Sequence, residues 1–169
     1  MVLGEFLGCS SYTILNVQSA GTDVPEDIEL AGLYEAVARA GQYQIWIRTT
    51  QDSCAIAVTV HHVRPEEELP ALAGTIVFDQ VVDFYDATVC VIPLAGVPMG
   101  EFALPEGEGR YRVVIATDVA DRAAMMRAEQ RAYADVPGTT LEQRLHRLDG
   151  RERYELVFRY VEPIPDDED

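Results

Sequence analysis

Lysine is absent from this chain of 169 residues, and all 13 of its basic residues are arginine. The 29 aspartates and glutamates outnumber them and leave a formal net charge of -16. Proteins that bind nucleic acid or an anionic membrane need a positive surface, which releases counterions or pairs with lipid headgroups. We therefore expect neither of these partners. A basic protein, by contrast, would be attracted by long-range electrostatics.

Cysteine is scarce, and its three copies form no motif. Cys9, Cys54 and Cys90 stand far apart without a Cys-X-X-Cys pair, which argues against a zinc cage or a dithiol redox site. Phe6-Leu7-Gly8-Cys9 is similar to a lipoprotein cleavage site, but Glu5 and the short preceding stretch do not fit a signal peptide. No run approaches the ~20 apolar residues of a membrane-spanning helix. We expect a reduced, cytoplasmic protein, and we attribute the use of arginine alone to a GC-rich bacterial genome.

Alternation of apolar and polar residues, typical of half-buried strands, recurs along most of the chain. It is clearest at 43–49 and 54–60, which turn residues separate, so we expect these two strands to form a hairpin. The stretch 28–40 fits either a helix or short extended pieces. Further strands are expected at 12–17, 75–84, 88–94, 101–104, 110–117 and 152–161. Short strands between turns predict a mainly β protein, an antiparallel β-sandwich in one domain spanning 1–162.

Residues 118–149 break this pattern. The segment 121–134 is rich in good helix formers, and Thr140-Leu141-Glu142-Gln143 has the spacing of a capping box ahead of a leucine stripe. We expect a helical insertion between the last two strands of the sandwich, which would make those strands neighbours in one sheet. Residues 163–169 are expected to form an acidic, flexible tail.

The chain contains histidine, cysteine and carboxylate residues, but their spacing matches no catalytic motif. Adjacent His61 and His62 would point to opposite faces of a strand, so they cannot share a metal ion. Cys54 and Cys90 alternate with apolar neighbours, as core thiols do. We expect no catalytic residue, no cofactor, no metal ion and no enzymatic activity. Paired carboxylates for glycoside hydrolysis remain an open alternative, because the sequence does not show which carboxylates are buried.

Acidic residues are the candidate partner-binding groups. Their spacing matches no calcium-binding loop. They form either a solvated acidic face or a surface that imitates phosphate charge to a basic protein. The candidates are Glu66, Glu67, Glu68, Asp79, Asp83 and Asp86.

The order of several segments resembles a known β-sandwich family. The segments are 33–41, the stretch to Val60, 74–79, Glu101-Phe102-Ala103-Leu104-Pro105 running into Gly109-Arg110-Tyr111-Arg112-Val113, and Arg153-Tyr154-Glu155-Leu156-Val157. The family includes the bacterial competence protein that inhibits a DNA-entry nuclease and many actinobacterial proteins. The resemblance covers most of the chain outside 118–149. It implies a non-enzymatic binding or inhibitory role and transfers no catalytic or binding residue.

Two functional hypotheses follow. The first is an acidic inhibitor or immunity-type protein that neutralises a basic partner such as a nuclease, with association accelerated by charge. The second is a structural module that oligomerises through sheet edges or the helical insertion. An enzyme would need a pocket in which carboxylates, His61 or His62 converge. The oligomeric state is not determined by the sequence.

Overall fold

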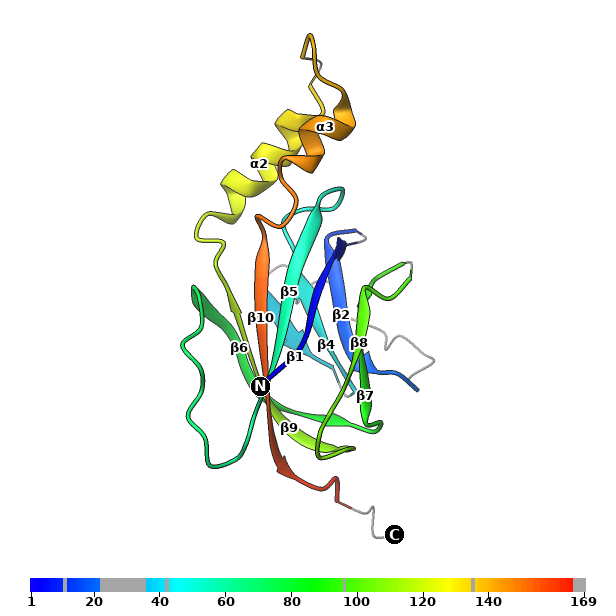
Figure 1. The fold of residues 1–169 in the computed structure, drawn as a ribbon, viewed down its shortest axis with the longest axis vertical. Helices are drawn as coiled ribbons and strands as arrows, with labels where there is room; N and C mark the ends of the chain where they lie inside the picture. Colours follow the sequence, from blue (N-terminus) through cyan, green and yellow to red (C-terminus); the bar gives the residue numbers. More distant parts are fainter. Residues whose placement is uncertain (11, 22–35, 42, 96, 135, 166–169) are drawn as a thin grey trace.

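The computed structural model describes residues 1–10, 12–21, 36–41, 43–95, 97–134 and 136–165. The described chain is mainly β, as predicted, and its strands form two sheets (Figure 1). Sheet A has the order β1 (Val2–Cys9), β5 (Ala55–Val63), β10 (Arg153–Glu162), β9 (Gly109–Thr117), β6 (Thr75–Phe84). Sheet B has the order β3 (Ala38–Ala40), β4 (Gln44–Arg48), β2 (Ile14–Ser19), β7 (Thr88–Pro93), β8 (Gly100–Ala103). Most of the ambiguous stretch 28–40 lies outside the described residues, and its end forms β3.

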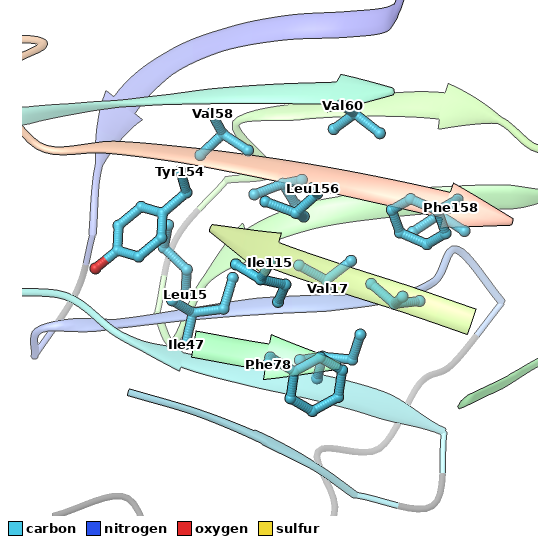
Figure 2. Close-up of a cluster of buried hydrophobic side chains, with 14 of the residues drawn as sticks. Leu15, Val17, Ile47, Val58, Val60, Phe78, Ile115, Tyr154, Leu156 and Phe158 are labelled. Carbon is cyan, nitrogen blue, oxygen red and sulfur yellow. The ribbon is translucent and has the colours of Figure 1, made fainter. Parts of the chain in front are cut away.

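One hydrophobic cluster joins the two sheets. It includes Val58 and Leu156 of sheet A together with Leu15 and Ile47 of sheet B, all fully buried (Figure 2). Each of these residues lies on the face of its strand that points toward the other sheet, because successive side chains of a strand point to opposite faces. The two sheets therefore bury one face each in a shared core.

The last strand occupies the middle of sheet A. β10 pairs antiparallel with β9, as predicted for the final two strands, and parallel with β5. Between β9 and β10 the chain forms α2 (Arg122–Ala132) and α3 (Leu141–His146), which project beyond one end of the sheets (Figure 1). The predicted capping box is present, with Thr140 and Gln143 each bonding the other's backbone. Within the described residues, neither helix is long and apolar enough to cross a membrane.

The predicted hairpin between 43–49 and 54–60 is wrong. β4 pairs with β2 and β3 in sheet B, whereas β5 pairs with β1 and β10 in sheet A. The segment 49–54 crosses from one sheet to the other. Alternation shows that one face of a strand is buried, and it does not identify the neighbouring strand.

The first strand was not anticipated, because glycines interrupt its alternation. A Cβ added at Gly8 would lie 2.9 Å from Cγ of Met99, so only glycine leaves room for the side chain of Met99. The rings of Phe6 in β1 and Phe102 in β8 lie 6.4 Å apart, centroid to centroid. β1 thus contributes to the contact between the two sheets as well as to the edge of sheet A.

Candidate partner interface

The predicted acidic residues lie on a loop, an edge strand and a turn. Glu66, Glu67 and Glu68 belong to the loop between β5 and β6, while Asp79 and Asp83 lie on β6. Asp86 follows in the turn to β7, where its carboxylate accepts the N–H of Thr88 at 2.9 Å. The six residues are therefore spread from the loop 64–74 along the edge of sheet A.

Arginines of the neighbouring strand pair with the carboxylates on β6. Nε and Nη2 of Arg112 donate to the two oxygens of Asp79, each at 2.7 Å, and this fork lowers the pKa of Asp79. Arg110 donates to Asp83 at 3.1 Å and to Glu162 at 3.2 Å. The charge that β6 presents to a partner is consequently smaller than the sequence indicates.

The glutamates of the loop are exposed. Glu67 accepts the N–H of Arg64 at 3.1 Å, which stabilises the turn. Within the described chain, Glu66 and Glu68 make no hydrogen bond or ion pair. Leu69 and Leu72 of the same loop pack over one part of the outer face of sheet A, against Val63, Val114 and Val157.

A buried carboxylate fixes the segment that crosses between the sheets. Glu152 is 0% exposed, and its oxygens accept hydrogen bonds from the N–H and the hydroxyl of Thr50, each at 2.8 Å, and from the N–H of Gln51 at 3.0 Å. The hydroxyl of Tyr154 donates to the same carboxylate at 2.7 Å. Burial and the charge of Glu152 raise the pKa of Tyr154, so this hydroxyl keeps its proton.

The helices are attached to the same segment. Glu129 of α2 accepts the backbone N–H of Asp52 at 3.1 Å and of Ser53 at 2.6 Å. Arg122 donates to the hydroxyl of Tyr154 at 3.1 Å and lies 4.0 Å from Glu152. These contacts fix the helical hairpin to the end of the sheets.

A hollow of about 360 Å³ opens on the outer face of sheet A. In the β-sheet register, Glu5 of β1 and Glu155 of β10 are both partners of Thr59 in β5. The two carboxylates therefore flank a small residue in one row across the sheet. The next row toward the helices consists of Leu7, Ala57 and Arg153.

A second hollow, of about 500 Å³, lies where the sheet meets α3. Its apolar lining comes from Ala55, Leu141 and Leu145, and Leu141 is 41% exposed. The polar lining includes His146, whose Nδ1 lies 2.5 Å from Asp149. Gly150 lines the first hollow and Asp149 the second, so the two hollows adjoin.

Among the described residues, Cys9 and His146 both line the second hollow, and the other histidine and cysteine side chains lie at separate positions. His62 is buried with Nε2 2.7 Å from Glu106, and His61 lies 4.0 Å from Glu155 on the outer face. Cys54 and Cys90 are buried as predicted, and burial raises their thiol pKa values to about 12 and about 11. Among the described residues, no three His, Cys, Asp or Glu side chains are grouped to hold a metal ion.

The fold is shared with a nuclease inhibitor. The chain matches the crystal structure of ComJ, inhibitor of the DNA degrading activity of NucA from Bacillus subtilis, with a TM-score of 0.59 and 11% identity over 95% of this chain and 98% of that one. It also matches the structure described as crocagin biosynthetic gene J, with a TM-score of 0.52 and 13% identity over 95% of this chain and 97% of that one. No family model and no curated protein matches the sequence. The family resemblance seen in the sequence is confirmed at the level of the fold.

The carboxylates that organise this end of the molecule have no recognisable signal in the sequence. Glu129 lies in a helix rich in charged residues, and Glu152 lies beside two arginines, so both match ordinary surface positions. The row that Glu5 and Glu155 form with Thr59 was not predicted either, because these residues meet only through the pairing of β1 and β10 with β5. The 150-residue separation of the two leaves no local signal.

Proposed function

We propose that this chain is a non-enzymatic, acidic binding protein, an inhibitor or immunity-type protein that neutralises a basic partner such as a nuclease. The proposal treats sheets A and B as the layers of a β-sandwich in one domain, 1–162, with a helical insertion at 118–149 and an acidic tail at 163–169. The charge of -16 is the observation that carries it. The fold shared with a protein described as a nuclease inhibitor supports it.

The arrangement of charges strengthens this proposal. Most arginines with described contacts donate to acceptors inside the chain; these are Arg110, Arg112, Arg122, Arg144, Arg153 and Arg159. Several carboxylates, by contrast, have no partner in the described chain, among them Glu5, Glu66, Glu68 and Glu142. These arginines thus bind groups within the chain, while the unpartnered carboxylates belong to a large excess of negative charge, which favours fast association with a basic protein.

Competition with DNA is the expected mechanism of inhibition. A nuclease binds the phosphate backbone through positive side chains, and an acidic protein that covers them blocks the substrate. Inhibitor and DNA would therefore exclude each other, and excess DNA would relieve the inhibition.

The test is capture from host extract on the immobilised chain, followed by elution with rising salt from about 0.05 M to about 0.5 M. We expect a basic protein to elute as salt screens the attraction, and the purified chain to slow its action on DNA. Recovery of acidic or neutral partners alone, or binding indifferent to salt, would contradict the proposal.

A second candidate, an assembly module, is favoured by the edge of sheet A. β6 spans ten residues at this edge, and its Ile76 and Val81 are both 53% exposed. An exposed edge strand can pair with the same strand of a second copy. Light scattering tests this alternative: a dimer that Val81→Lys dissociates supports it, and a strict monomer at high concentration excludes it.

A further inference from the structure

We propose that the two adjoining hollows on the outer face of sheet A bind an extended segment of the basic partner, with an arginine over Thr59 and an apolar side chain beside α3. This inference rests on the proposed function and specifies its contact surface. It names a site other than the loop and edge carboxylates predicted from the sequence.

The carboxylate row provides the arginine site. Glu5 and Glu155 are separated by two strand spacings, about 9.5 Å between backbones, with the short side chain of Thr59 between them. A guanidinium above Thr59 has donors on both of its edges and can reach a carboxylate on each side. The carboxylate of Glu5 has no hydrogen bond or ion pair within the described chain, so its charge is available.

The apolar site lies at a distance that an extended peptide can match. Ala55 borders the hollow beside Leu141 and Leu145, four residues along β5 from Thr59 and on the same face. Four residues of a strand span about 13 Å. In an extended ligand, residues four apart also point to one side. The expected ligand thus has an apolar residue four positions from its arginine.

The negative charge around the two hollows favours a basic segment as their occupant. Glu5 and Glu155 line the first hollow, and Glu142 and Asp149 line the second. Among the described residues, the only arginine that lines either hollow is Arg153, whose Nε donates to the carbonyl of Gly150 at 2.9 Å. A second copy of this acidic chain would meet repulsion here. A basic segment with one apolar anchor satisfies both the charge and the apolar lining.

The proposed site is confined to one part of the outer face of sheet A, because the loop 64–74 covers another part. Leu69 and Leu72 cover the part of sheet A around Val114, whereas Leu7 remains 63% exposed beside the first hollow. The open surface therefore runs from the Glu5 row to α3 and ends where the loop 64–74 begins to cover the sheet.

The experiment uses synthetic peptides and the ¹⁵N-labelled full chain. The peptide Gly-Arg-Gly-Ser-Gly-Leu-Gly has the predicted spacing of four. One comparison peptide replaces Arg with Glu, and another, Gly-Arg-Gly-Leu-Gly-Ser-Gly, has a spacing of two. We expect the first peptide alone to shift the amide signals of Ala55, Ala57 and Thr59. Absence of shifts at the solubility limit, or equal shifts with all three peptides, would overturn the site.

Matched variants separate this site from general acidity. The double variant E5Q/E155Q should weaken peptide binding about fivefold, and Leu141→Ser should weaken it without changing charge. The control E66Q/E68Q removes the same charge from the loop and should leave binding unchanged. Far-UV circular dichroism verifies that each variant is folded.

The same variants distinguish failure of the site from failure of the proposed function. The captured host partner should bind E5Q/E155Q about fivefold more weakly than E66Q/E68Q. If a basic partner binds both variants equally, the site is wrong and the proposed function stands. If the unchanged chain captures no basic partner, the proposed function itself is wrong.

Discussion

Glu152 accepts two hydrogen bonds from Thr50, a residue 102 positions earlier, one from its N–H and one from its hydroxyl. The pair joins the segment that crosses between the sheets to the start of the central strand β10. Glu129 adds a second carboxylate to the same segment from α2. Two buried acidic groups, Glu129 and Glu152, therefore have a structural role in this acidic chain.

Replacement of Glu152 by Gln should destabilise the protein by about 2–4 kcal/mol, because an amide group would face backbone donors and could accept through one atom only. Urea denaturation followed by tryptophan fluorescence measures this change. Glu155→Gln is the control on the exposed face, with an expected loss below about 0.5 kcal/mol. Equal stability of the two variants would refute the role assigned to Glu152.

The three thiols should react with iodoacetamide at different rates. Cys9 is exposed, although burial of its sulfur and the charges of Asp149, Asp52 and Glu129 raise its pKa. Cys54 and Cys90 are buried, with higher pKa values. Because the thiolate is the nucleophile, we expect Cys9 to be labelled first, more slowly than free cysteine, and the other two only after unfolding. Mass spectrometry of timed samples measures this order, and early labelling of Cys54 would contradict it.

The pairing of Asp79 with Arg112 should contribute stability with a defined pH dependence. A carboxylate whose pKa is lowered in the folded state stabilises the fold above about pH 4, where the unfolded carboxyl is ionised. The contribution disappears as the pH falls through the lowered value, and it stays below about 1 kcal/mol because the pair is exposed to solvent.

NMR titration of the Asp79 carboxyl tests this pairing. Arg112→Gln should raise its pKa toward 3.8, the ordinary value. The control Arg127→Gln removes an exposed arginine that lies 3.8 Å from Asp121, and it should leave Asp79 unchanged. An unaltered titration of Asp79 in Arg112→Gln would show that the fork does not persist in solution.

Two glycines with positive φ should respond differently to alanine. Gly74 has φ +97°, and an added Cβ would lie 2.1 Å from the carbonyl oxygen of Thr117. Gly138 has φ +80°, and among the described residues other than its chain neighbours no atom lies within 4 Å of that position. Gly138→Ala should therefore cost about 1 kcal/mol from backbone conformation alone, and Gly74→Ala several times more because the backbone must move. Thermal unfolding measures both, and similar losses would contradict the predicted clash.

The sequence predicts this protein's elements better than their partners. Alternation located β4, β5, β9 and β10, and the capping box at Thr140 located α3, because these signals lie within a few neighbouring residues. The placement of β4 and β5 in separate sheets depends on the pairing of β4 with β2 and β3 and of β5 with β1 and β10, which no local pattern contains. The row of Glu5 and Glu155 could not be predicted for the same reason. The loop and edge carboxylates that the sequence did predict remain a proposal for partner binding.

The position of β10 has a consequence for biosynthesis. This strand follows all other described strands in the chain, yet it lies between β5 and β9 in the sheet. Until it has been synthesised, both neighbours expose unpaired backbone groups along the edges that it later covers, and such edges promote aggregation. Sheet A can therefore be completed only after β10 has been synthesised. Cleavage near the exposed Gly138 would separate β10 from the two strands that flank it, which is the arrangement that fragment complementation requires.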